Sequence, residues 1–373
     1  MYIPSWTYKY DLEINRVEYI NAINEVFDSG RLIFGKQLEN FEKSFSDYIG
    51  TKFAIGCDNA TNAIFLSLKS LGVGEGDEVI TVPNTAIPTV SAICQAGAKP
   101  VFVDVNRYAL MDINKLEEII NQKTKAIIPV HLYGFPCDMD KISLISQKYN
   151  IHIIEDCSQA HGTILNNKKV GSFGKLSCFS FYPTKSLGGF GDAGIICTND
   201  INCDDLLKKM RFYGIENDYI ASIDGYNSRM DEIHAAILNK KLTRLEKNIK
   251  YRNEILDLYI NGINSDLLVP LPKPQNARTS NYLLPFIFKG NRERFLNKLS
   301  QENIGVNISY KHPIHTMPAY KHLGYKKGDF KKAEFICDHI VSLPICDYLP
   351  MEIAYHVINS LNTILNDNRD YLS

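Results

Sequence analysis

A single lysine follows a β-rich, apolar run at a point where its amine could do covalent chemistry. Lys185 ends the segment 180–185, and a glycine-rich stretch, 188–194, comes directly after it. Lysine amines act as nucleophiles towards carbonyl compounds when desolvation or a neighbouring cation favours the free amine. A lone lysine is far more often an exposed loop residue, so this interpretation depends on the residues around it.

The glycine-rich stretch contains a pattern that could be taken for a dinucleotide-binding loop. Residues 189–194 match GxGxxG letter for letter. That fingerprint must follow a strand and open a helix, whereas the β-favouring run 195–198 follows here. The glycines are better explained by tight backbone turns beside a ligand. The pattern therefore disfavours a nicotinamide-dependent dehydrogenase.

An acidic pair, Glu155 and Asp156, stands at the end of another β-favouring run, 151–154. A buried carboxylate needs a cationic partner, and a protonated pyridine nitrogen is one candidate. The alternative is that Asp156 caps a helix. Gln159 and His161 follow closely, either as ligand-binding groups or as satisfied polar groups of a loop.

Three further segments carry polar side chains near predicted element ends. The turn 58–62 joins a strand to a helix, whose N-terminal amides and hydroxyls could bind phosphate; simple capping by Asn59 or Thr61 is the alternative. Segment 225–232 is another polar helix start. In segment 310–315 a proline separates the two histidines, which disfavours a helical metal pair, so we predict no metal site.

These residues fall where the strands of an open α/β sheet are expected to end. Between residues 51 and 200, short β-rich runs alternate with helical patterns, which is typical of a mostly parallel sheet covered on both faces. Ligands bind such sheets at the carboxyl ends of the strands. The expected strands are 53–57, 78–82, 100–103, 126–130, 151–154, 177–181 and 194–198, and the expected helices are 62–71, 88–96, 113–121 and 139–149.

The pattern changes beyond the breaker-rich segment 269–274. A strand at 282–288 and helices at 293–302, 332–339 and 351–365 indicate a smaller α+β unit. We predict a large domain, 1–245, and a small C-terminal domain, 246–373. Whether the N-terminal dozen residues pack on the small domain is left open.

Composition excludes several classes of protein. The 373 residues include 41 Lys and Arg and 42 Asp and Glu. The chain therefore lacks the surplus of basic residues that is typical of a general nucleic-acid binder. The nine cysteines form no CxxC pair, and free thiols in this number suit a reducing compartment. We find no secretory signal and no apolar run long enough to span a membrane, so we expect a cytoplasmic protein.

Together these segments resemble the DegT/DnrJ family of sugar aminotransferases, which use pyridoxal phosphate (PLP) on the fold-type-I, aspartate-aminotransferase-like scaffold. The resemblance extends from about residue 29 to residue 315. It depends on three runs, 155–162, 180–185 and 227–231, which occur in the family's order and spacing. One run alone would be weak support, but the three together are specific.

The resemblance implies a role for each matching residue. Lys185 would bind the cofactor covalently and move protons, Asp156 would pair with the ring nitrogen and keep it protonated, and Gln159 would hydrogen-bond the phenolic oxygen. The phosphate would be bound by Ala60, Thr61 and Ser180, and by Asn227 reaching from the other subunit of a homodimer. The residues expected to contact the sugar substrate are His131, Tyr182, Tyr310, His312 and His315.

Two positions depart from the family pattern. Ala60 stands where a glycine is usual, which backbone donation tolerates if φ is negative. Ala86 stands where many relatives place an aromatic residue against the cofactor ring. One branch of the family replaces the lysine by histidine and dehydrates sugars, and Lys185 disfavours that branch.

The implied activity is transfer of an amino group, with L-glutamate as the expected donor, to a nucleotide-diphosphate-linked keto-6-deoxyhexose. Gln159, where many 4-keto enzymes have histidine, favours a dTDP-3-keto sugar. The alternatives are a 4-keto sugar or cyclitol aminotransferase, a sugar dehydratase, and a non-catalytic family member. The cations expected near the diphosphate are Lys311, Lys321, Lys326 and Lys327.

Overall fold

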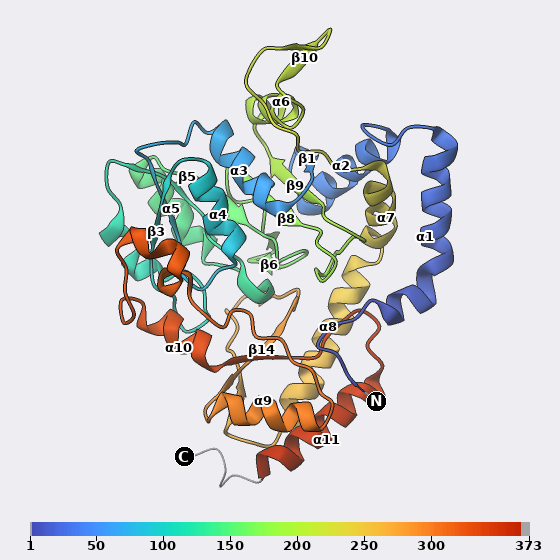
Figure 1. Ribbon diagram of the computed structural model, residues 1–373, viewed down its shortest axis with the longest axis vertical. Helices are drawn as coiled ribbons and strands as arrows, with labels where there is room; N and C mark the ends of the chain where they lie inside the picture. Colours follow the sequence, from blue (N-terminus) through green and yellow to red (C-terminus); the bar gives the residue numbers. More distant parts are fainter. Residues whose placement is uncertain (1, 367–373) are drawn as a thin grey trace.

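The computed structural model describes residues 2–366, and a seven-stranded sheet forms its centre (Figure 1). Strands β8, β5, β4, β2 and β3 run parallel to one another, and β9 runs antiparallel to both β1 and β8. The expected α/β class with a mostly parallel sheet is therefore confirmed. The strand order is β1 (Phe53–Cys57), β9 (Gly194–Thr198), β8 (Leu176–Ser180), β5 (His152–Asp156), β4 (Thr124–Ile127), β2 (Glu78–Thr81) and β3 (Lys99–Phe102).

Helices cover both faces of this sheet because successive strand residues point to opposite sides. In β8, Cys178 belongs to the core under α3, α4 and α6, whereas the next residue, Phe179, belongs to the core under α2 and α7. Helix α5 covers the second face near β4 and β5. The covering helices are α2 (Lys36–Ile49), α3 (Ala60–Ser70), α4 (Ile87–Gln95), α5 (Met139–Tyr149), α6 (Ile201–Met210) and α7 (Glu232–Leu242).

The register of the sheet brings the ends of three strands to one edge. Asp156 of β5 pairs with Cys178 of β8, so these two parallel strands end side by side. Gly194, the first residue of β9, pairs with both Ser180 and Cys57. A Cβ on Gly194 would stand 2.5 Å from the carbonyl carbon of the residue before α3, so only glycine allows this approach.

A second, antiparallel sheet with its own core lies beside the first (Figure 1). The predicted boundary at residue 245 coincides with the first residue of α8, while residues 367–373 of the predicted small domain lie outside the described residues. The division itself stays a prediction. The elements of this part are β12 (Leu268–Pro270), β14 (Leu284–Phe288), β15 (Ile340–Leu343), α8 (Leu245–Gly262), α9 (Arg292–Gln301) and α11 (Met351–Asn366).

The N-terminal residues lie on this second core, which answers the question left open by the sequence. Ile3 is buried there and bridges Ile304, with its amide donating to the carbonyl of Asn303 at 2.8 Å. The chain then enters α1 (Lys9–Ser29), which packs along α7. The first residues of the chain therefore belong structurally with the C-terminal part.

One predicted helix is wrong, and several small elements were not predicted. Residues 113–121 form two short 3-10 turns, because Leu116 is the only apolar side chain of the segment that is fully buried. The hairpin of β10 and β11 projects from the top of Figure 1. The remaining elements are η1 (Ile113–Lys115), η2 (Glu117–Ile119), η3 (Leu132–Gly134), β6 (Ile164–Leu165), β7 (Lys168–Lys169), β10 (Ile215–Asn217), β11 (Ile220–Ala221), β13 (Ala277–Arg278), η4 (Ile314–Thr316), η5 (Pro318–Leu323) and α10 (Lys331–His339).

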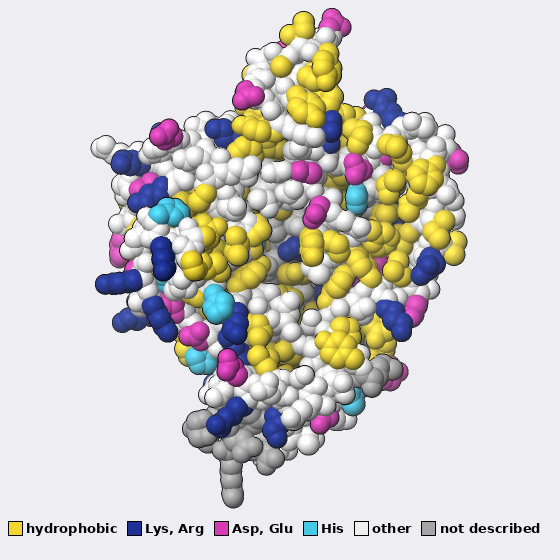
Figure 2. Space-filling view, viewed as in Figure 1, with side chains coloured by type: hydrophobic (Ala, Val, Ile, Leu, Met, Phe, Trp, Pro, Cys, Tyr) yellow, Lys and Arg dark blue, Asp and Glu magenta, His cyan; other side chains and the backbone are white. Residues whose placement is uncertain are grey.

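Among the exposed large apolar side chains, several lie on α1 and on the projecting hairpin. Val17 and Phe27 are exposed on α1, and Tyr219 and Ile220 are exposed on the projecting hairpin. Figure 2 shows hydrophobic side chains gathered over the hairpin and along the side of the molecule that carries α1. Among the described helices, none is long and apolar enough to cross a membrane.

Candidate active site

A cavity of about 560 Å³ opens at the sheet edge where β5 and β8 end. Its volume is in the range of small-molecule and cofactor sites. Most of the residues predicted for the site line it together, although they come from distant parts of the chain. These are Ala60, Thr61, Asp156, Gln159, Ser180, Tyr182, Lys185, Tyr310 and His312.

Lys185 lines this cavity just beyond the end of β8. Its amide donates to the carbonyl of Tyr182 at 2.9 Å, which closes a turn. The amine nitrogen stands 4.6 Å from the ring centroid of Tyr282, and the Tyr282 hydroxyl lies 3.0 Å from that of Thr184. Within residues 2–366 no carboxylate forms an ion pair with Lys185, so its amine is available to a ligand.

Asp156 lies at the end of β5 with only 4% of its surface exposed. Thr89 donates its hydroxyl hydrogen to Oδ2 at 2.8 Å, and the amide of Ser158 donates to Oδ1 at 3.1 Å. The structure shows no helix after Asp156, so the capping alternative is wrong. Since a buried carboxylate without a cation is costly and no cation pairs with Asp156 among the described side chains, the cavity suits a ligand that brings a positive charge there.

The opposite end of the site is the N-terminus of α3. Asn59 caps this helix by accepting from the amide of Asn62 at 2.8 Å, as the capping alternative predicts. The first two helical amides, those of Ala60 and Thr61, have no partner in the described part of the chain and point out of the helix. Ala60 is helical with negative φ, so it can donate its amide as glycine would. This end of the cavity suits a phosphate.

Gln159 also lines the cavity and is held in one orientation. Its Oε1 accepts from the backbone amide of Tyr133 at 2.7 Å, and its Nε2 donates to the hydroxyl of Tyr310 at 2.9 Å. Burial raises the pKa of Tyr310, so this hydroxyl stays protonated at neutral pH. The second hydrogen of the Gln159 amide is left for a ligand in the cavity.

Three predicted site residues are not brought to the cavity of this chain. His131 is fully buried against Glu155, and His315 is buried with its Nε2 3.0 Å from Glu334 Oε1. Neither histidine lines the cavity, because each ring is used in a buried contact with a carboxylate. Asn227 is exposed and also lies outside it, so any role for Asn227 in a site requires a second subunit.

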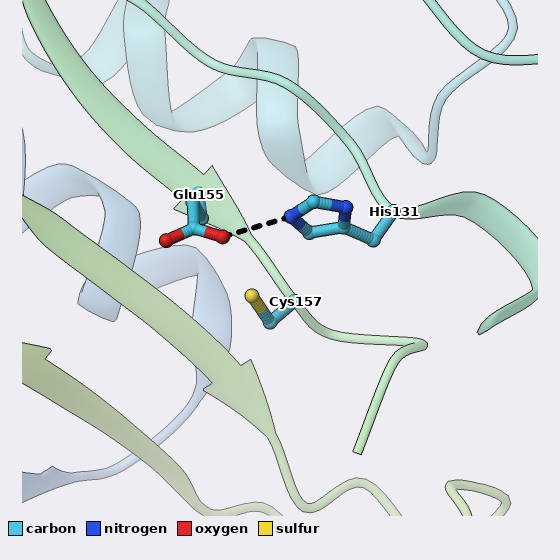
Figure 3. Close-up of side chains that lie close together, drawn as sticks. All are labelled: His131, Glu155 and Cys157. Carbon is cyan, nitrogen blue, oxygen red and sulfur yellow. Dashed lines mark hydrogen bonds and ion pairs between the residues drawn. The ribbon is translucent and has the colours of Figure 1, made fainter. Parts of the chain in front are cut away.

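His131, Glu155 and Cys157 form a compact buried trio whose potential ligand atoms lie within 4.8 Å of one another (Figure 3). The carboxylate of Glu155 already accepts from three backbone amides, those of Gly171, Phe173 and Gly174, at 2.7–2.8 Å. His131 Nδ1 accepts from the amide of Cys137 at 3.0 Å, so its Nε2 carries the proton and donates to Glu155 at 3.1 Å. These bonds make the trio a structural support for the neighbouring Asp156.

Replacing Glu155 by glutamine is expected to destabilise the protein by about 3 kcal/mol. Both carboxylate oxygens accept N–H groups, so the amide NH2 of glutamine would face at least one donor. Urea unfolding of the two proteins measures the difference. The control is Glu216→Gln, which removes one partner of an exposed ion pair with Lys209 and should leave the stability nearly unchanged. Equal stability of the two variants would contradict this role for Glu155.

His161 is fully buried beside the rings of Phe179 and Phe181, with ring centroids 5.5 and 5.6 Å away. Burial, and after it the charge of Lys185, lower the pKa of His161 to about 3. In the unfolded chain the same imidazole binds a proton below about pH 6.5. Since the unfolded state binds more protons between these values, the free energy of unfolding must fall as the pH drops below about 6.5.

The acid sensitivity due to His161 can be isolated with the variant His161→Gln, which does not titrate. Between pH 7.5 and pH 5.0 the wild type should lose about 2 kcal/mol more stability than the variant, at about 1.4 kcal/mol per pH unit below pH 6.5. Urea unfolding at both pH values gives the four free energies needed. An equal loss in the two proteins would show that His161 does not stay neutral in the folded state.

Several cavity-lining residues were not predicted as site residues. Thr89 and Thr85 are joined by a 2.9 Å hydrogen bond and support Asp156 from α4 and the turn before it. Their spacing of one helical turn just after a predicted strand was the available signal. Tyr282 comes from the second sheet region, and no local pattern relates it to Lys185. Lys311, which was expected as a cation near the diphosphate, does line the cavity. The other lining residues that were not predicted are Asn59, Ile64, Ala86, Ile87, Pro88, Val130, Leu132, Ser158, Thr184, Asp192, Ser309 and Met317.

Comparison with known proteins agrees with the resemblance seen in the sequence. A dTDP-3-amino-3,4,6-trideoxy-alpha-D-glucose transaminase of Micromonospora megalomicea subsp. nigra is 38% identical, over 96% of this chain and 98% of that protein. The crystal structure of S. venezuelae DesV in complex with a ketimine intermediate superimposes with a TM-score of 0.94 at 33% identity, covering 97% of this chain and 98% of that one.

A further solved structure, the PLP-form of the putative sugar aminotransferase Spr1654 from Streptococcus pneumoniae, has a TM-score of 0.89 at 25% identity and covers 98% of both chains. The family model for DegT/DnrJ/EryC1/StrS aminotransferases matches residues 13–362. This match includes strand β5 with Asp156, the turn after β8 with Lys185, and the loop that carries Tyr310. The chain belongs to the DegT/DnrJ/EryC1/StrS aminotransferase family.

Proposed function

We propose that this protein is a PLP-dependent aminotransferase that places an amino group on C3 of a dTDP-linked 3-keto-6-deoxyhexose. The observation that carries the proposal is the placement of Lys185, Asp156 and the α3 N-terminus around one cavity. An amine, a buried carboxylate and a phosphate-binding helix end are the three groups that PLP requires. When bound, PLP supplies an electron sink that stabilises negative charge at the substrate carbon.

Each end of the cavity holds a different part of the cofactor in this proposal. Asp156 accepts a hydrogen bond from the ring nitrogen and favours its protonated form. The amides of Ala60 and Thr61 bind the phosphate together with the hydroxyl of Ser180. Gln159 donates its remaining amide hydrogen to the phenolic oxygen.

Lys185 has two tasks in the proposed reaction. Its amine binds the cofactor covalently before substrate arrives, and the absence of an ion pair in the described part of the chain leaves it available for this. With the cofactor in place, the same nitrogen would remove the proton at the α-carbon of the amino donor. It later delivers a proton to C3 of the acceptor sugar. L-Glutamate is the proposed donor.

The acceptor binds at the outer part of the cavity. The residues proposed to contact it are Tyr182, Tyr310 and His312, which line the cavity, and Tyr182 is half exposed. Lys311 also lines the cavity and is the cation best placed for the diphosphate, whereas Lys321, Lys326 and Lys327 do not line it. The name of the Micromonospora relative, a dTDP-3-amino sugar transaminase, supports the choice of nucleotide and ring carbon.

We further propose a homodimer in which Asn227 reaches the phosphate bound by the other subunit. The exposure of Asn227, and the apolar side chains exposed on α1 and the hairpin, support this arrangement. Mixing the inactive variants Lys185→Ala and Asn227→Ala tests it, because a mixed dimer would contain one intact site only if Asn227 acts across the interface. No recovery of activity on subunit exchange would contradict the shared site.

We also propose that the protein is located in the cytoplasm. All nine cysteines are free, and eight of them are buried. Free thiols in this number are typical of a reducing compartment. Fractionation of cells that produce the protein tests the location, and recovery in a membrane or extracellular fraction would contradict it.

The absorption spectrum of the purified protein with PLP tests whether the protein binds this cofactor covalently. We expect a visible absorption band that borohydride removes by fixing the cofactor to the protein, followed by a mass increase on the peptide that contains Lys185. A colourless protein that does not bind PLP would instead support a non-catalytic role. The band on its own would not identify the substrate.

The product identifies the substrate class. With a dTDP-3-keto-6-deoxyhexose and L-glutamate, NMR of the product should show the amine on C3. A 4-amino product from the 4-keto isomer would replace the C3 assignment. Faster turnover of a keto-cyclitol would favour a cyclitol aminotransferase, and loss of water without amination would indicate a dehydratase.

A further inference from the structure

The turn after β4 contacts both sides of the active site, and its residue Tyr133 does so without lining the cavity. Tyr133, in this turn, has only 1% of its surface exposed. Its backbone amide donates to Gln159 Oε1 at 2.7 Å, and its hydroxyl donates to the carbonyl of Ser309 at 2.6 Å. One side chain and its own backbone therefore connect the cofactor half of the cavity with the loop 309–312 from the C-terminal part.

The amide contact decides which way the Gln159 side chain faces. Because Oε1 accepts from Tyr133, the NH2 group must face Tyr310 and the cavity. The reverse orientation would set the NH2 group against the amide hydrogen of Tyr133. The turn thus determines that Gln159 offers donors to whatever the cavity binds.

The hydroxyl contact fixes the loop that carries Tyr310, Lys311 and His312. On either side of this loop, the amide of Asn307 donates to Ser342 and that of Ile314 donates to Pro83, at 3.0 and 2.8 Å. Between those two points, the hydrogen bonds that attach the loop to other described segments are Tyr133 to Ser309 and Gln159 to Tyr310. Both depend on the same turn.

The turn itself is held rigidly. Tyr133 has φ of 61°, a conformation that is unfavourable for a bulky residue and persists only where the surroundings impose it. The next residue, Gly134, also has positive φ, and a Cβ there would stand 2.5 Å from the Ser280 hydroxyl oxygen. Because the turn is rigid and makes one hydrogen bond to Gln159 and another to Ser309, it can couple the positions of these two residues.

We propose that Tyr133 is a positioning residue that sets the loop 309–312 against Gln159 and so determines the affinity for the acceptor sugar. The inference rests on the proposed function, because it assigns the loop to acceptor binding. Removing the Tyr133 hydroxyl leaves the backbone amide in place, so Gln159 keeps its orientation. The half-reaction with the amino donor should then be unaffected, while acceptor binding weakens.

The variant Tyr133→Phe tests this in the PLP-loaded protein. We expect the KM for the dTDP-keto sugar to rise about tenfold, with kcat and the rate of the L-glutamate half-reaction within about twofold of wild type. The matched control is Tyr259→Phe, which removes another buried hydroxyl that donates to a backbone carbonyl, that of Pro344, at 3.1 Å. It should change neither constant.

Hydrogen exchange of the same proteins, followed by mass spectrometry, gives a second readout that needs no turnover. In Tyr133→Phe the amides of peptide 306–313 should exchange about tenfold faster than in wild type or in Tyr259→Phe. Unchanged exchange and an unchanged KM would overturn the proposal, as would an equal loss in both half-reactions. If the wild-type protein aminates no sugar, the proposed function is wrong. The hydrogen-exchange comparison does not depend on activity, so it still tests whether Tyr133 fixes the loop.

Discussion

Replacing Lys185 by alanine is expected to abolish amino transfer, lowering kcat by at least about 10⁴-fold. The size of the effect follows from the two tasks that one nitrogen performs, covalent attachment of the cofactor and proton transfer at the reacting carbon. The alanine variant should also lack the visible band and should not be labelled by borohydride. Steady-state rates and absorption spectra of the two proteins measure both effects.

Two comparisons separate the chemistry of Lys185 from structural damage. Lys209→Ala removes a lysine that pairs with Glu216 on the surface and should leave rate and spectrum unchanged. Added methylamine should restore part of the proton transfer in Lys185→Ala, because a small amine can enter a cavity of about 560 Å³ from which the side chain was removed. A variant that keeps its band and its activity would refute the central assignment of this protein.

Replacing Asp156 by asparagine should lower kcat by about 10³-fold while the protein stays folded. Asparagine has nearly the same size and can still accept one of the hydrogen bonds that Thr89 and Ser158 donate. It carries no charge, so it cannot favour the protonated ring nitrogen on which the electron sink depends. Single-turnover rates of both half-reactions measure the loss, which should appear in each.

The variant Thr89→Val perturbs Asp156 less than the asparagine substitution does and should lower the rate less. It removes only the hydroxyl that donates to Asp156 at 2.8 Å, and we expect a loss of about tenfold or less. Asp138→Asn is the control, since Asp138 caps α5 and asparagine caps helices as well. A normal rate in Asp156→Asn would mean that the carboxylate does not act on the cofactor ring.

The residues of the cofactor half of the cavity could be predicted from the sequence because each of them follows a local sequence pattern. The runs before Asp156 and Lys185 are continuous apolar strands, and parallel strands necessarily deliver the residues that follow them to one edge. The capping turn of Asn59 is equally local. Strand patterns and helix-start signals therefore sufficed to place these groups together.

The other half depends on contacts between distant segments, which periodicity does not encode. His131 and His315 were expected at the substrate, yet each is used in a buried pair with a carboxylate, Glu155 or Glu334. A polar residue after a strand looks the same in the sequence whether it faces a ligand or a buried partner. Tyr133 was missed for the same reason, because its partner Ser309 lies in a different sheet region.

The helix expected at 113–121 shows a further limit. Its apolar residues have helical spacing, and Ile113, Ile119 and Ile120 pack half-buried against the same core as the fully buried Leu116, yet the segment forms two 3-10 helices. Secondary structure there is decided by tertiary packing, which a single sequence does not report.

The bridge between Ile3 and Ile304 has a consequence for how the protein is made. These two paired residues are separated by about 300 positions in the sequence, so this contact raises the contact order of the fold. At roughly 5–20 residues per second, the N-terminal segment waits on the order of 15–60 s for that partner. Because Tyr310 and His312 are synthesised after Ile304, the cavity is completed only after that partner has been made, and a nascent chain halted before them would be inactive.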